Sequence, residues 1–174
     1  MTRTYWADGR LTHFLLGLSH NSSAMNTLAN ELLVHILSPT FLVPEAHFAD
    51  NGHISPFAKV MQSSADVQLV CKRWMRVSTP LLYECVVIRT RAQAYALRLA
   101  LTRHPEFGRF IRRLRLEGVF GEYLDAEVFE KMQGVKQLCF TFSFSSLNNI
   151  AGLQRAFEVF NPERVVLSLR DTYY

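Results

Sequence analysis

The sequence predicts a mixed α+β or α/β protein, with a helical module at 25–80 followed by a βα array at 81–174. Two observations predict this class. Before residue 80, apolar residues recur at helical spacing in two segments that a proline-containing stretch separates. After residue 80, helical segments separate segments in which apolar and polar residues alternate. This order is typical of strands joined by helices.

Composition limits the class of protein further. The chain has 174 residues, of which 49% are hydrophobic and 20% charged, so it can form a core and is not globally disordered. Its longest apolar run, at 14–18, is far shorter than the roughly 18 residues that a membrane span requires. Asp8 precedes this run, unlike in a signal peptide. We expect no membrane partner, and we interpret residues 1–24 as a poorly ordered extension.

The three cysteines, Cys71, Cys85 and Cys139, are an odd number without CxxC spacing. This pattern favours reduced, buried thiols over a disulfide framework or a zinc site. Cys71 lies beside two basic residues, which could lower a thiol pKa. Its helical spacing with Trp74 is better explained by a small core residue. We expect a cytoplasmic or nuclear protein, or one present in both compartments.

The first helical segment is predicted over 25–37. It should end at Ser38-Pro39, because the residue before a proline is pushed out of the α region. The following stretch, 39–64, is predicted to be a long loop with one short helical turn around Phe57–Met61. Loops of this length are uncommon inside compact domains and require an explanation. The apolar residues with helical spacing are Leu28, Leu32, Leu33, Ile36 and Leu37.

A second helix is predicted to begin at the capping-box pattern Ser63-Ser64-Ala65-Asp66 and to end at Pro80. We expect this helix to pack against the core through a single apolar face. The residues of that face are Val67, Val70, Cys71, Trp74 and Val77.

The second part of the chain predicts four strands, with helices between them at 92–102, 124–132 and 151–160. Segments that begin at Leu82, Ile111, Val135 and Pro162 are offset by about 29, 24 and 27 residues, within the range of leucine-rich repeats. A plain α/β layer with the same elements is the alternative. Because no capping helix follows the last strand, we interpret the array as shortened.

No motif for catalysis stands out, since the chain has no Gly-x-Ser-x-Gly elbow, glycine-rich phosphate loop or His-x-x-x-His pair. His47, Asp50 and His53 share the predicted loop and could meet a metal ion. Loop histidines at irregular spacing are better explained as solvated. We expect no enzyme activity, no cofactor and no metal.

The positive charge is concentrated in the middle of the chain. Eleven lysines and arginines lie between residues 71 and 116, against Glu84 and Glu106. Such a stretch could form a phosphate-binding surface. No stacking aromatics interleave with the arginines and no nucleic-acid motif is present, so nucleic acid is not the expected partner. We interpret the stretch as a solvated or protein-binding face.

Two segments carry a resemblance to a known family. The segment from Leu28 to Leu37, with the sequence LANELLVHIL, resembles the opening pattern of an F-box. The segment from Val70 to Val77, with the sequence VCKRWMRV, resembles its third helix. The sequence from Pro80 to Gly118 is similar to fungal, mushroom-lineage F-box-like proteins, in which a leucine-rich-repeat-like region follows. The resemblance covers roughly Leu28 to Leu167.

The resemblance implies a three-helix F-box-like module followed by a short leucine-rich-repeat-like βα array. It also implies a non-catalytic receptor subunit that binds a Skp-type adaptor, and through it a cullin, to tether an unknown target protein to a ubiquitin ligase. The alternative is an interaction scaffold without a ligase link, which binds an acidic partner or nucleic acid through 72–115. The implied adaptor-binding residues are Leu28, Glu31, Leu32, Ile36, Leu37, Leu69, Val70 and Trp74.

Two features depart from the F-box pattern. Ala29 stands where the pattern has proline, but alanine is the best helix former, so the first helix should persist. A compact F-box joins its first and third helices through a short hydrophobic second helix. This chain instead has the stretch 39–64, which we interpret as an inserted loop.

Overall fold

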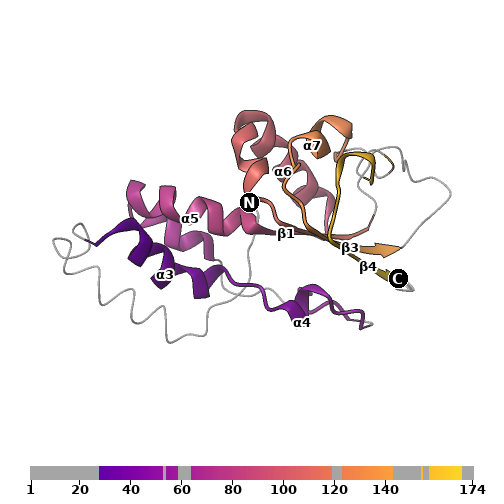
Figure 1. Cartoon of the computed structure of the whole chain (residues 1–174), viewed down its shortest axis with the longest axis horizontal. Coiled ribbons are helices and arrows are strands. Elements are labelled where there is room, and N and C mark those ends of the chain that lie inside the picture. Colours follow the sequence, from indigo (N-terminus) through magenta and orange to yellow (C-terminus); the bar gives the residue numbers. More distant parts are fainter. Residues whose placement is uncertain are drawn as a thin grey trace. The chain divides into compact units, whose positions relative to one another are not determined.

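The computed structural model describes residues 28–52, 54–58, 64–118, 123–142, 154 and 157–169. The chain divides into two compact units. Of the described residues, the helical unit contains 28–43 and 64–82, and the sheet unit contains the rest. The protein is of mixed α/β class, and its helices alternate with four parallel strands in one sheet (Figure 1).

The helical unit contains α3 (Asn30–Phe41), the 3₁₀ helix η1 (Ser64–Leu69) and most of α5 (Lys72–Glu84). Its core comes from apolar residues at helical spacing, which is the pattern that predicted the helices. On α3 these residues recur every four positions, and on α5 Trp74 is also buried. The buried apolar side chains are Leu33, Leu37, Phe41, Val43, Val67, Trp74 and Leu82.

Two of the predicted helix ends are wrong. Pro39 lies inside α3, and Pro80 lies inside α5. A proline removes only its own N–H donor and disfavours the turn before it, at a cost of about 3 kcal/mol. Buried side chains beyond each proline hold the last turn in place, namely Phe41 in α3 and Leu82 in α5. Packing therefore outweighs the local preference at both sites.

The second predicted helix is interrupted. Residues 64–69 form η1, and α5 begins only at Lys72. The 3₁₀ geometry and the break at 70–71 change the angular spacing of the side chains, so they do not share one face. Val67 and Trp74 are buried, whereas Val70 and Cys71 are exposed, which corrects the prediction of a single apolar face.

The four predicted strands are confirmed. They are β1 (Cys85–Ile88), β2 (Arg113–Glu117), β3 (Gln137–Phe142) and β4 (Arg164–Leu169). All neighbours are parallel, and the strand order follows the chain order. Paired residues are 28, 24 and 27 positions apart along the chain. The offsets in the sequence therefore correspond to the register of the sheet.

The helices α6 (Arg91–Arg103) and α7 (Ala126–Glu130) connect the first three strands, and η2 (Pro105–Phe110) follows α6. These helices confirm the predictions at 92–102 and 124–132. A capping box, which we did not predict from the sequence, begins α6, and in it the Gln93 N–H donates to Thr90 Oγ1 at 3.2 Å. Asp125 caps α7, since its Oδ1 accepts from the Val128 N–H at 3.0 Å. In the segment 151–160, where a helix was also predicted, residues 154 and 157–159 are helical, and 151–153 and 155–156 lie outside the described residues.

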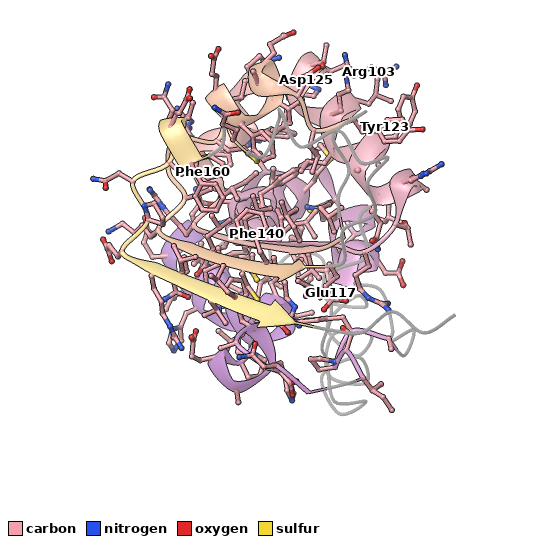
Figure 2. All side chains as sticks on the ribbon, turned by 90° about the vertical axis from the view of Figure 1, so that its right-hand side faces the viewer. Arg103, Glu117, Tyr123, Asp125, Phe140 and Phe160 are labelled. Carbon is pink, nitrogen blue, oxygen red and sulfur yellow. The ribbon has the colours of Figure 1, made fainter. Side chains whose placement is uncertain are left out.

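The main core lies on one face of the sheet. Side chains alternate between the two faces of a strand, so one face carries the leucines of β2 and β3, and α6 and α7 lie on this side (Figures 1 and 2). The ring of Phe140 lies 5.3 Å from that of Phe157, and Phe129 meets Phe160 edge-on at 5.6 Å. The core side chains include Val86, Ile88, Leu97, Leu101, Leu114, Leu116, Val128, Phe129, Met132, Leu138 and Phe140.

The cysteines divide into two groups. Cys85 and Cys139 are buried, as predicted, and burial raises the pKa of Cys85 to about 12. Cys71 is exposed, which corrects its assignment to the core. Cys71 directly precedes the first turn of α5, and Trp74, within that turn, is the residue that is buried. Across the described part of the chain, no helix has the length and apolar character needed to cross a bilayer.

Gly108 gives a test of how closely η2 packs against the residues that follow α7. A Cβ at this position would lie 1.9 Å from the backbone oxygen of Lys131, which requires the backbone to move. We expect Gly108→Ala to lower the free energy of unfolding by about 1–3 kcal/mol in urea denaturation. Gly52→Ala is the control, because its added Cβ would lie 3.0 Å from the side-chain carboxylate of Asp50 and no nearer than 3.9 Å to the backbone of Ile54. Equal stability of the two variants would contradict this packing.

Candidate functional site

The residues implied in adaptor binding all belong to the helical unit, where they lie in two groups with different exposure. Leu32, Leu69 and Val70 are exposed by 54%, 83% and 56%. Leu37 and Trp74, by contrast, are buried. The exposed group could contact a partner directly, whereas the buried group can only support the surface from within.

The remaining implied residues lie on α3. Leu28, just before the helix, and Ile36 are partly exposed. Glu31 is exposed in the first turn of α3, where a negative charge is favourable for the helix dipole. The exposed face of this helix therefore combines apolar residues with one acidic residue.

Arg73 joins the two segments that carry the resemblance. It lies in the first turn of α5, and its guanidinium donates to the backbone oxygen of Leu28. Its Nε also donates to Asn30 Oδ1 at 3.1 Å. The start of α5 is therefore held at the start of α3, although more than forty residues separate them in the sequence. This contact places the start of α5, shortly after Val70, beside the start of α3, shortly before Leu32.

A second candidate feature is the segment 44–58, which we call the strap. From its sequence we predicted that this segment is part of a loop inserted between the first and third helices. In the structure it belongs to the sheet unit, and it includes the short helix α4 (Glu45–Phe48). The strap covers the face of the sheet opposite α6 and α7 (Figure 1). Phe48 and Phe57 of the strap are fully buried.

Arg115 on β2 fixes the strap to the sheet, and its side chain is fully buried. One terminal nitrogen donates to the backbone oxygen of Phe48, and the other donates to that of Asp50 at 3.0 Å. The guanidinium also lies 5.5 Å above the ring of Phe57. A single side chain thus binds the strap at three places.

Glu117, two residues further along β2, completes this contact. Its Oε1 accepts from Arg115 Nε at 2.8 Å and from Ser55 Oγ at 2.7 Å. Its Oε2 accepts from Arg89 Nε at 2.8 Å, and Arg89 also donates to the backbone oxygen of Phe57 at 2.6 Å. Figure 2 shows Glu117 near the arrowhead end of the strands. Both oxygens of this carboxylate therefore take part in holding the strap.

The environment of Glu117 keeps it ionised. Burial by itself would raise the pKa of this carboxyl. Hydrogen bonds from Ser55 and Arg115, the charge of Arg115 and the hydrogen bond from Arg89 outweigh burial, so the pKa of Glu117 lies below its ordinary value. The two guanidinium groups are therefore balanced by a carboxylate inside the contact.

The other end of the strap is held by Glu45. This residue forms ion pairs with Arg164 on β4 and with Arg113 on β2, the latter at 3.8 Å. The guanidinium of Arg113 also lies 5.4 Å above the ring of Phe48. Arginine stacked on an aromatic ring adds a cation–π attraction to the packing of the ring.

We predicted a solvated or protein-binding face for the basic stretch between residues 71 and 116, and this is wrong for Arg115. Arg115 is buried, because the strap supplies the carbonyl groups and Glu117 the carboxylate that its donors require. Other basic residues of 72–115 also bind within the chain. Arg73 contacts α3, Arg89 contacts Glu117, and Arg98 lies 3.2 Å from Asp125.

The described residues place no three potential metal ligands together. His47 and Asp50 lie in the strap, and His53 lies outside the described residues. No protein-family model, curated protein or solved structure matches this chain.

Arg115→Met tests the central contact of the strap. Methionine fills a similar volume but leaves two strap carbonyls without a donor and removes one cation from Glu117. Breaking a buried pair from one side costs about 3–5 kcal/mol. We expect a loss of this size in the free energy of unfolding, measured by urea denaturation. Arg91→Met, which changes an exposed arginine in the first turn of α6, is the control. A loss no larger than that of the control would contradict the assigned role.

Glu117 should also make stability depend on pH. Its pKa is lower in the folded chain than in the unfolded chain, so its contribution is complete above about pH 4.3. That contribution is lost as the pH falls through the lowered folded value. We therefore expect the stability advantage of the natural protein over Glu117→Gln to be constant above about pH 4.3 and to shrink as the pH is lowered below it. Urea denaturation of both proteins above and below this pH measures it, and a constant difference throughout would rule out the linkage.

Proposed function

We propose that the chain is a non-catalytic receptor subunit of a Skp–cullin–F-box ubiquitin ligase. In this proposal the helical unit is an F-box-like module that binds a Skp-type adaptor. The sheet unit is a short leucine-rich-repeat-like array that serves target recognition. Catalysis would be supplied by other subunits of the complex.

One observation supports the docking role above the others. The two segments that resemble an F-box are joined by Arg73, and each of them exposes apolar side chains over a buried core. Exposed apolar groups on a structured support are typical of protein–protein interfaces, where a few anchors supply most of the affinity. Leu32, Leu69 and Val70 are the anchors that fit this description.

The array supports the other half of the proposal. Each of the first three strands is followed by a parallel neighbour 24–28 residues later, and the strand order is that of the chain. This combination is typical of repeat proteins, in which each unit contacts only the next. Repeat arrays commonly function as binding surfaces for other proteins.

The alternative is a scaffold without a ligase link that binds an acidic partner or nucleic acid through 72–115. The ion pairs of Arg89 and Arg98 and the burial of Arg115 favour the receptor over this alternative. These groups are already bound to Glu117, Asp125 and the strap. An acidic partner would have to compete with these contacts.

Adaptor binding can be tested with charged substitutions at the exposed anchors. Leu32→Asp and Val70→Asp replace exposed side chains, so they should leave the fold intact. We expect tagged natural protein to recover a Skp-type adaptor and a cullin from fungal extract. Each variant should weaken adaptor binding by about tenfold or more, measured by titration with purified adaptor.

Leu42→Asp is the matched control. Leu42 directly follows α3 and is 58% exposed, similar to the anchors, but it lies outside both resembling segments. Its variant should bind the adaptor like the natural protein, and circular dichroism should show equal helix content in all variants. Failure to recover an adaptor, or equal weakening by all three substitutions, would refute the proposed surface.

A further inference from the structure

Three serine or threonine residues in the chain directly precede a proline: Ser38, Ser55 and Thr79. Two of them lie inside helices. Ser38 Oγ donates to the backbone oxygen of Val34 at 2.7 Å, and Thr79 Oγ1 donates to that of Met75 at 2.6 Å. Both hydroxyls are thus bound one turn back along their own helices, whereas Ser55 lies in the strap, outside any helix.

This difference matters for proline-directed protein kinases. Such enzymes accept a serine or threonine whose chain runs extended into the following proline. A residue before proline favours the extended region unless packing enforces a helix. The helices α3 and α5 enforce it at Ser38 and Thr79. The strap imposes no such helix at Ser55.

We propose that Ser55 is a site of phosphorylation by a proline-directed kinase and that its phosphate releases the strap from the sheet. In the transfer, Ser55 Oγ attacks the γ-phosphorus of ATP and forms the new O–P bond. The bond to the β–γ bridging oxygen breaks, and ADP leaves. The hydroxyl proton passes to a base of the kinase.

The contacts of Ser55 determine what the phosphate would do. Ser55 Oγ donates to Glu117 Oε1 at 2.7 Å and accepts from the Phe57 N–H at 3.1 Å. A phosphate carries a charge of about −1.5 to −2 at neutral pH and no longer has this proton to donate. It would meet an ionised carboxylate within a largely buried contact, where like charges repel strongly.

The neighbouring arginines do not remove this conflict. Arg89 and Arg115 are already bound to Glu117, so two guanidinium groups would face a carboxylate and a phosphate dianion. Separation of residues 54–58 from the sheet relieves the repulsion. It exposes Phe57 and breaks the bond from Arg89 to the backbone oxygen of Phe57. The Glu45 end of the strap is unaffected, because its contacts are with Arg113 and Arg164.

Access to Ser55 depends on transient opening. Its side chain is largely buried, while Ile54 beside it is exposed by 81%. A kinase would therefore act on molecules in which this part of the strap has opened, and the phosphate would prevent it from closing. Local opening of surface segments is a normal property of native proteins.

The first test is phosphorylation of the full chain by a purified proline-directed kinase with ATP, mapped by mass spectrometry. We expect phosphate on Ser55 and none on Ser38 or Thr79. Ser55→Ala and Pro56→Ala should both abolish it. Glu117→Gln weakens a charge-assisted hydrogen bond that closes the strap, so it should accelerate phosphorylation by about tenfold or more. A synthetic peptide of residues 50–60 is the control for recognition of the sequence.

Two outcomes would overturn the assignment of the site. One is a folded chain that stays unmodified while the peptide is phosphorylated, which would show that the strap does not open. The other is a peptide that the kinase does not accept.

Hydrogen exchange tests the release. In the phosphorylated chain, the Phe57 amide should exchange at least about tenfold faster, because it loses its bond to Ser55 Oγ. Amides of β2 should change little. Unchanged or slower exchange at Phe57 would overturn the release, since it would place the phosphate on Arg89 and Arg115 in place of Glu117.

Discussion

The buried guanidinium of Arg115 is the constraint on which the sheet unit depends. Arginine stays charged under all ordinary conditions, so its burial requires both a counter-charge and acceptors for its donors. Glu117 supplies the charge, and the backbone oxygens of Phe48 and Asp50 supply acceptors. Without the strap this side of β2 would expose the arginine, and without the arginine the strap carbonyls would be buried without donors. The buried Arg115 and the closed strap are therefore stable only together.

This dependence makes the two faces of the sheet physically different. Parallel sheets are normally covered on both faces. Here α6 and α7 cover one face through aliphatic and aromatic contacts, which are not directional and depend mainly on area. The strap covers the other face through the buried rings of Phe48 and Phe57 and through ion pairs and hydrogen bonds, whose strength depends on geometry and charge. A single added charge therefore has a large effect on the strap face.

Much of the sheet unit could be predicted from sequence, because its pattern is local and repeated. The alternation around Leu114 and Leu138 and the spacing of the strands identified β2 and β3 and their order. The strap could not be predicted, because its contacts join residues such as Ser55 and Glu117, which are 62 positions apart. The helix ends predicted at Pro39 and Pro80 are wrong for a related reason. Packing against distant residues overrides the tendency of a proline to end a helix. The length of the loop between the two F-box-like segments was the one hint of the strap in the sequence.

The path of the chain through the two units has a consequence for modularity. The chain leaves the helical unit after Val43, contributes the strap to the sheet unit, returns, and leaves again after Leu82. Each unit is therefore assembled from separate stretches of sequence, and no single cut divides them. A recombination event at residue 80 would transfer the strands without the segment that supplies the carbonyl acceptors for the buried Arg115. A sheet unit moved into another protein would therefore need the strap as well as the strands.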